Sequence, residues 1–481
     1  MTISPRSWPD QPAGNPWAAP PVAPPLQASR PGPAVNPPAL PEQKPDALMY
    51  SVALLLFAYV WRIQDAFPIL GKLQLPLLGL GLATVFFITT RHPWRRANRI
   101  RGPIVYLTLG LWALMLIGVP TSLWPGHSLT FAMKTYLSNL LFMGLTAASV
   151  RSIRDVEWYA TVNLYGGLFY AMMVNVFFRV GSDGRLGSLV YYDANDFALV
   201  MVATVPFAVY LLKYGQKGMR RAIGLLALGL IMLALVKSGS RGGFLGMIAV
   251  MLYILLRYKA IPSTTRLFVA VAGILLAILI GSDKYWEQMG TILHPTSDYN
   301  WSDPQGRREV WKRGVTYVEH NPVLGLGVGA YPIAEGTLSD VSQARAEAGR
   351  GFKWSVAHNS FLETAAELGI PGLIIFVGLF VASFRLLRRV RPGGIYGPGI
   401  SKRETALSQM LIGSLFGFAI SGIFVSAEYF SYLYFLLGMV IGLDKVLRLR
   451  RDSGFAMAPR WAPAMRAVPA MRASAVMSPR A

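Results

Sequence analysis

Long apolar runs separated by short polar connections dominate the chain between residues 47 and 444. Many of these runs reach about 18 residues, the length that an α-helix needs to cross ~30 Å of hydrocarbon. A transmembrane β-barrel would instead show alternating segments of about 10 residues. The pattern predicts an all-α polytopic membrane protein with about twelve transmembrane helices, near residues 47–62, 73–90, 103–120, 129–149, 157–178, 195–212, 222–237, 242–256, 267–281, 359–384, 405–425 and 428–444.

Lysine and arginine are divided unequally between the two sets of connections. One set holds 24 of these residues, at 91–101, 151–154, 213–221, 257–266, 385–403 and 445–451. The short connections of the other set hold 6, at 62–72, 120–128, 179–193, 237–241 and 425–428. Because cytoplasmic loops are enriched in basic residues, the first set is predicted to be cytoplasmic, and both termini with it.

This orientation predicts the organisation of the whole chain. Residues 1–46, which include PPVAPP, read as a disordered Pro-rich cytoplasmic tail. Residues 47–281 hold the first nine transmembrane helices, and 282–357 form a large loop outside the cell membrane, in the periplasm of a Gram-negative cell. Residues 358–447 hold the last three helices, and 448–481 form a second cytoplasmic tail.

The formal net charge of +22 raises the question of a nucleic-acid partner. The basic residues lie in short loops between apolar runs, where they set membrane topology, so we expect a lipid bilayer as partner and no nucleic acid. The chain has no cysteine, which excludes disulfides and thiolate metal sites. It also has no HExxH motif and no GxxxxGK(S/T) phosphate loop. We therefore expect no metal, no cofactor and no nucleotide-driven pump.

The large loop is predicted to be ordered. Loops longer than about 15 residues are usually functional or disordered, and this one contains four tryptophans. The segment GRREVWKRGVTYVEHNP has the periodicity of an amphipathic helix, with Val310, Gly314 and Val318 on one face. The following GLGVGAYP ends that helix.

Several arginines fall on the predicted outer side, against the topological bias. These are Arg185, Arg241, Arg307 and Arg308. A guanidinium binds phosphate oxygens through two parallel hydrogen bonds and stays charged, so arginines that converge from separate segments would suit a diphosphate. Alternatively, Arg185 is an ordinary loop cation, and Arg307 and Arg308 belong to a solvated helix face. Helical periodicity does not decide between Arg307 and Arg308.

A histidine opens the tenth predicted helix at the same side. In AHNSFLETAAELGIPGL, His358 and Asn359 precede an apolar run. A neutral imidazole can accept a proton from a hydroxyl near neutral pH, so His358 is the candidate general base. Asn359, Glu363 and Asn195 are candidate supporting residues. The alternative is that His358 caps its helix and that Asp193, Asn195 and Asp196 cap the sixth.

The motifs together resemble the O-antigen ligase and polymerase superfamily of bacterial envelope enzymes. The resemblance rests on SGSRGG at 238–243, on GRREVWKRG and HNPVLGLGVGAYP within 306–332, and on AHNSFLETAAELGIPGL at 357–373. It covers roughly residues 48–447, and the motifs are specific as a set rather than singly.

This resemblance implies a GT-C-like membrane glycosyltransferase in the bacterial inner membrane. Its donor would be a glycan on undecaprenyl diphosphate, and its acceptor a hydroxyl of a glycan or of a molecule like lipid A-core, at the periplasmic face and without a metal. The resemblance gives His358 the role of assisting the acceptor hydroxyl. It gives Arg241, with Arg307 or Arg308, that of holding the diphosphate; Arg185 matches more loosely.

Four functions remain open at this stage. A ligase would attach a finished glycan, whereas a polymerase would join repeat units that are still lipid-linked. A related ligase could glycosylate proteins. A flippase or transporter would perform no chemistry and would be expected to show internal repeats and polar residues at mid-membrane. The sequence favours the ligase slightly over the polymerase.

Overall fold

The computed structural model describes residues 44–179, 181, 186–187, 191–215, 217–294, 296, 301, 303, 306–351, 354–397 and 399–452. They fall within one unit of the chain, Glu42–Ala458. The helices along the predicted membrane region are α1 (Ala47–Tyr59), α4 (Leu75–Thr89), α5 (Pro103–Gly118), α6 (Pro125–Thr130), η4 (Phe131–Tyr136), α7 (Leu137–Ser149), α8 (Ile153–Phe177), α9 (Ala194–Tyr214), α10 (Lys217–Ser238), α11 (Arg241–Arg257), α12 (Ser263–Ile280), α18 (Ser360–Arg388), α19 (Lys402–Gly422) and α20 (Ser431–Arg450).

Each of the twelve predicted segments falls on one of these helices, and the protein is an all-α polytopic membrane protein. Within the described residues, seven helices have the length and composition to cross a bilayer: those that contain α5, α8, α9, α10, α12, α18 and α19. The other five segments fall on α1, α4, α7 and α11, which have 17 residues or fewer, and on α20, which carries several charges.

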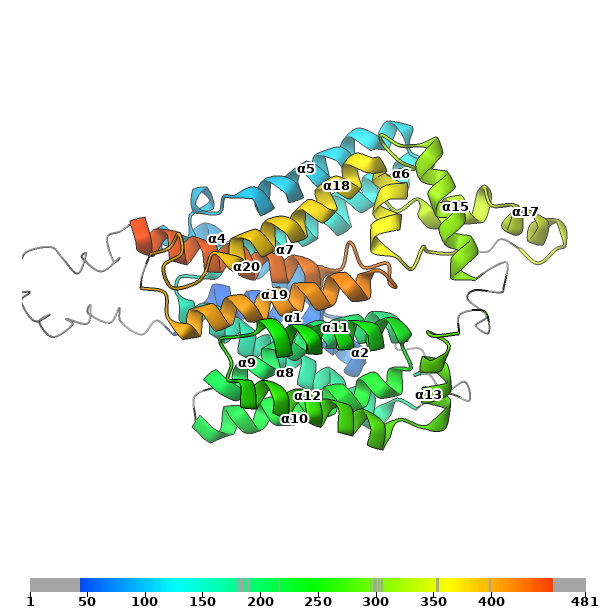
Figure 1. Cartoon of the computed structure of the whole chain (residues 1–481). Coiled ribbons are helices and arrows are strands. Elements are labelled where there is room, and N and C mark those ends of the chain that lie inside the picture. The colour runs from blue at the N-terminus through cyan, green and yellow to red at the C-terminus, as the bar shows by residue number, and fades with distance from the viewer. Residues whose placement is uncertain are drawn as a thin grey trace, which may run out of the picture. The chain divides into compact units, whose positions relative to one another are not determined.

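The predicted loop at 282–357 contains four helices in its described part: α13 (Asp283–Gly290), α15 (Arg307–His320), α16 (Tyr331–Thr337) and α17 (Asp340–Glu347). In Figure 1, α13, α15 and α17 lie at one end of the membrane helices. The predicted amphipathic helix is confirmed as α15, which buries Val310 and Gly314 as expected, together with Tyr317. It packs on α18.

Helix α18 is broken at Gly369, and the loop after α15 fits into the break. Gly369 has φ +67°, and a Cβ there would lie 2.5 Å from the carbonyl oxygen of Val323. The backbone N–H groups of Leu326 and Gly327 donate to the carbonyl oxygens of Ala366 and Glu367, at 2.8 and 3.0 Å. The loop thus satisfies backbone acceptors that the break leaves without helical donors, and it fixes the first turns of α18.

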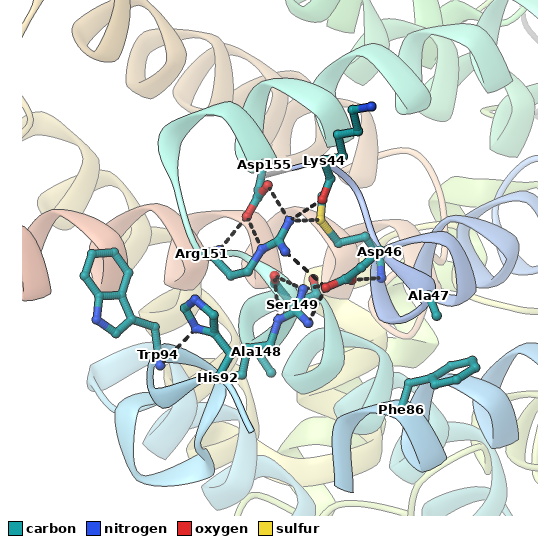
Figure 2. A network of polar contacts seen from close by, with 12 residues as sticks. Lys44, Asp46, Ala47, Phe86, His92, Trp94, Ala148, Ser149, Arg151 and Asp155 are labelled. Carbon is teal, nitrogen blue, oxygen red and sulfur yellow. Dashed lines mark hydrogen bonds and ion pairs between the residues drawn. The ribbon is translucent and has the colours of Figure 1, made fainter. Parts of the chain in front are cut away.

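The opposite end of the bundle is held by an ionic cluster, shown in Figure 2. Asp46 caps α1 and pairs with Arg95 at 2.6 Å and with Arg151 at 3.1 Å. Arg151 also pairs with Asp155 at 3.0 Å, and both arginines are at least 90% buried. The cluster joins the starts of α1 and α8 to the 91–101 connection, which the charge pattern predicts to be cytoplasmic.

Candidate functional site

His358 is held at the start of α18 by contacts with the connection between α19 and α20. Its backbone N–H donates to the Ser426 hydroxyl oxygen at 2.9 Å, and its φ is +49°, an uncommon value for a residue other than glycine. Asn359 caps the helix by accepting hydrogen bonds from Phe361 and Leu362 N–H, both at 3.1 Å. The half-buried His358 therefore sits on a fixed backbone.

Two glutamates of α18 complete this support. Glu363 accepts hydrogen bonds from the Ala357 N–H at 3.1 Å and from the Ser426 hydroxyl. One carboxylate therefore holds both the residue before His358 and the serine that binds the His358 backbone. Glu367 accepts from the Tyr331 N–H and from the Tyr429 hydroxyl, each at 3.0 Å. Both glutamates are at least 95% buried. They tie α18 to the 321–331 loop on one side and to the 426–429 connection on the other.

Arg241 is the first residue of α11. The Ser240 hydroxyl caps that helix through the Gly243 N–H at 3.1 Å and donates to the Asn195 side-chain oxygen at 2.8 Å. The half-buried Arg241 donates from Nη1 to the Thr291 hydroxyl oxygen at 2.7 Å, just after α13. These contacts join α9, α11 and α13 at one point.

Small residues bring Arg241 and His358 to the same end of the bundle. A Cβ on Gly242 would lie 2.7 Å from the Phe424 side chain, and one on Gly422 would lie 3.3 Å from the Ser360 hydroxyl. Phe424 stands two residues before Ser426, which binds His358. The starts of α11 and α18 therefore both pack on the end of α19. A site that combines Arg241 with His358 requires such an arrangement.

The structure separates Arg307 from its neighbour Arg308. Arg307 is half-buried and interacts electrostatically with the Asp196 carboxylate at the start of α9. Arg308 is 45% exposed at its side chain, pairs weakly with Glu309 at 3.9 Å, and stacks over the Trp301 ring at 5.4 Å. Arg307 is thus within electrostatic range of the start of α9, whereas Arg308 stays on the helix surface.

Of the residues at the start of α9, two cap the helix and one belongs to the candidate site. Asp193 and Asp196 form a reciprocal cap, so the capping interpretation is confirmed for them. Asn195 is 7% exposed and is bound to Ser240. Arg185, the loosest of the predicted phosphate ligands, lies outside the described residues.

An ion pair organises the soluble helices beside this site. Arg313 of α15 donates to the Glu335 carboxylate of α16, with its shortest contact at 2.6 Å, and the Tyr317 hydroxyl donates to the same carboxylate at 3.1 Å. The hydrogen bond to Glu335 raises the pKa of Arg313 further above its usual value. Burial, followed by the Glu335 charge, raises the pKa of Tyr317. The pair fixes α15, and with it Arg307.

Sequence reasoning missed Ser426 and Tyr429. Ser426 and Tyr429 lie 68 and 71 residues after His358, in the connection VSAEYF, and no local pattern links them to it. Among the described residues, no group of three or more His, Cys, Asp or Glu side chains is suited to a metal ion.

The fold and this arrangement define a class: a polytopic helical membrane protein with a polar cluster at the end of the bundle that carries its soluble helices. Residues 225–377 match the family model described as O-Antigen ligase. The matched region contains Arg241, Arg307, Arg308 and His358.

The chain is also similar to the teichuronic acid biosynthesis protein TuaE of Bacillus subtilis (strain 168). The two are 22% identical over 277 residues, which cover 55% of this chain and 53% of that protein. The chain thus aligns with about half the length of this relative. Together the two comparisons support a role in polysaccharide biosynthesis.

Proposed function

We propose that this protein is a glycosyltransferase of the O-antigen ligase type. It moves a glycan from undecaprenyl diphosphate to an acceptor hydroxyl at the periplasmic face of the inner membrane. The proposal is supported by the packing of the elements that carry the candidate residues: α11, which begins with Arg241, and α18, which follows His358, both start against the end of α19, and α15, which begins with Arg307, packs on α18. The family match of residues 225–377 supports the same chemistry.

The arginines would bind the diphosphate of the donor. Arg241 begins α11 and Arg307 begins α15, so the positive ends of two helix dipoles add to the two guanidinium charges. As the bond between the sugar and the diphosphate breaks, its electron pair moves to the leaving phosphate oxygen. Fixed cations in a site with little water stabilise that developing charge more than they stabilise the ground state.

His358 would accept the proton of the acceptor hydroxyl. The hydroxyl oxygen then attacks the anomeric carbon, a new glycosidic bond forms, and the lipid diphosphate departs. Direct displacement of this kind inverts the anomeric configuration. General-base assistance by a positioned histidine typically contributes ~10²–10⁴ in rate. The Glu363–Ser426 support would keep the imidazole where a bound hydroxyl can reach it.

The orientation of the site follows from the charge pattern. The helices that begin at this end, α9, α11 and α18, follow connections of the set with 6 basic residues, or the large loop. That set is the one predicted to face away from the cytoplasm. The periplasmic side offers no nucleotide supply, so the energy of transfer would come from the donor's own diphosphate bond.

The grouping of the candidate residues at one end favours an enzyme over a flippase, which would be expected to carry its polar residues at mid-membrane. Deletion of the gene, followed by gel analysis of surface glycan, tests the proposal. Loss of attached glycan with accumulation of lipid-linked polymer supports a ligase. Surface glycan limited to single repeats supports a polymerase. Accumulation of donor on the cytoplasmic leaflet would contradict both and support a flippase.

A further inference from the structure

A cavity of about 280 Å³ is lined in part by the 426–431 connection, which also contacts His358. Tyr429 and Ser431 line it, and Ser426, a few residues earlier, binds His358. Its other walls come from the corner after α1, from η4 and α7, and from the tyrosines that precede α9. The volume is near the lower end of the ~300–1,000 Å³ typical of small-molecule sites, so the cavity has room for a short stretch of sugar.

Among the described residues, the walls of the cavity contain two basic residues and no acidic one. One is Arg62, whose guanidinium is held in place by two hydrogen bonds to Asp65, both 3.2 Å, and by the Tyr191 ring at 3.9 Å. Its Nε and Nη2 atoms are engaged by Asp65, whereas Nη1 has no hydrogen bond within the described residues. The backbone at Arg62 has φ +48°, a strained conformation that is typical of functional positions.

The second cation is Lys134, on the π-helical turn η4. Turns of this kind occur frequently at functional sites. The turn is anchored by the Trp112 indole N–H, which donates to the Ala132 carbonyl oxygen at 3.1 Å, and by the Tyr136 hydroxyl, which donates to that of Thr108 at 3.0 Å. The exposed ammonium group of Lys134 has no ion pair or hydrogen bond within the described part of the chain.

The remaining walls are rich in aromatic rings, from Tyr59, Tyr191, Tyr192, Tyr429 and Phe430. The Tyr192 and Tyr429 hydroxyls are engaged by the Val60 carbonyl and by Glu367. Asn139 is fixed between the Tyr429 carbonyl and the Ser431 hydroxyl, both at 2.7 Å. The walls therefore present rigid aromatic faces, which suit the C–H faces of a pyranose ring, beside cations that suit a carboxylate.

We infer that this cavity is an acceptor subsite that binds a carboxylate-bearing sugar of the acceptor glycan, with Lys134 and Arg62 on the carboxylate and Tyr191 on the sugar ring. That the bound sugar belongs to the acceptor rests on the function proposed above. That the cavity binds an acidic saccharide does not depend on that function. The donor diphosphate would lie at the Arg241 and Arg307 side of the 426–431 connection, and the acceptor would approach from this side.

Calorimetric titration of the purified full-length protein in lipid nanodiscs tests the inference. The probes are tetragalacturonate and its methyl ester, which has the same sugars without the charges. We expect the acid to bind and the ester to bind at least 10-fold more weakly. Lys134→Gln should weaken binding of the acid at least 10-fold and Tyr191→Ala should also weaken it, whereas the matched control Lys312→Gln, on the exposed face of α15, should leave it unchanged.

Equal unfolding temperatures for Lys134→Gln and the wild type would show that the variant is folded. Absence of binding by the wild type, equal binding of acid and ester, or unchanged binding by Lys134→Gln would each overturn the inference. So would loss of binding in phosphatidylglycerol nanodiscs but not in phosphatidylcholine ones, since a lipid headgroup would then be the occupant. His358→Ala should still bind tetragalacturonate, so failure of the proposed function and failure of this subsite are separate results.

Discussion

The Ser426 hydroxyl oxygen accepts a hydrogen bond from the His358 backbone N–H at 2.9 Å, and the same hydroxyl donates to the Glu363 carboxylate. One serine thus connects the start of α18 with the connection after α19. Because His358 has a left-handed backbone with φ +49°, this support holds a conformation that most residues avoid. The position of the imidazole depends on a contact between segments that are far apart in the sequence.

Ser426→Ala should lower turnover on the order of 10-fold, because it removes the hydrogen bond to His358 and leaves the buried Glu363 carboxylate with one partner fewer. The KM for the donor should stay within twofold, since the diphosphate ligands are elsewhere. Ser426→Thr should recover most of the turnover. The control is Ser421→Ala, because the Ser421 hydroxyl is buried and has no hydrogen-bond partner among the residues that the structure describes. A donor KM that rises as steeply as turnover falls would contradict a positioning role.

Arg307 and Arg308 provide a matched pair of adjacent arginines. Arg307→Gln should raise the donor KM at least 10-fold, because Arg307 is half-buried and its charge acts on the start of α9, where Asn195 binds the Ser240 cap of α11. Arg308→Gln should change it less than twofold, because Arg308 is exposed and pairs only weakly with Glu309. Steady-state transfer from a lipid-linked donor measures both values. Equal effects of the two substitutions would remove the assignment of Arg307.

Arg241→Lys should fail although it keeps the charge. A lysine cannot donate two parallel hydrogen bonds to phosphate while one nitrogen of the same group is held by Thr291, as Arg241 Nη1 is at 2.7 Å. We expect transfer to fall at least 10-fold, as followed by product formation in proteoliposomes. Arg257→Lys, at the other end of α11, is the control. Wild-type activity of Arg241→Lys would count against bidentate phosphate binding.

Asp46→Asn should destabilise the protein by about 1–3 kcal/mol, because it leaves the buried Arg95 and Arg151 without a shared partner. The Asp46 side chain is 38% exposed, so solvent screens its charge and the loss is smaller than for a fully buried ion pair. Burial raises the pKa of Asp46, but the hydrogen bond and charge of Arg95, with that of Arg151, outweigh it, and the pKa lies below its usual value.

A lowered pKa in the folded protein means that this stabilisation is fully present above the unfolded value of ~3.9 and is lost as the pH falls through the folded value. The difference in unfolding temperature between wild type and Asp46→Asn should therefore be constant from pH 7 to 5 and shrink below pH 4. The exposed pair of Asp452 and Arg451 offers the control Asp452→Asn, which should have little effect. A difference that grows toward acid pH would contradict the assignment.

The helices could be predicted from the sequence because each apolar run must satisfy its own backbone in the bilayer. The break in α18 was not predicted, although Gly369 and Pro371 mark it in the sequence. Its form depends on Leu326 and Gly327, which donate to the freed carbonyl groups from a loop about 40 residues earlier. A hydrophobic pattern contains no information about such a partner.

The candidate site was predicted in its residue types but not in its supporting contacts. Arginine is under-represented in the outer loops of membrane proteins and histidine is rare in this sequence, so both residue types stand out. Arg307 and Arg308 are consecutive on a helix, and their different burial together with the position of Asp196 on α9 distinguishes them. Ser426 was missed because a serine in a short connection has many ordinary roles.

The central claim is that His358 acts as the base at a site where the arginines hold the donor. Transfer from a labelled undecaprenyl-diphosphate-linked glycan by His358→Ala tests this most directly, with donor binding measured on the same sample. His320→Ala, an exposed histidine at the end of α15, is the matched control. The account predicts that His358→Ala loses at least 100-fold in transfer while donor affinity and the His320→Ala rate stay at wild-type levels. Full turnover by His358→Ala would contradict it.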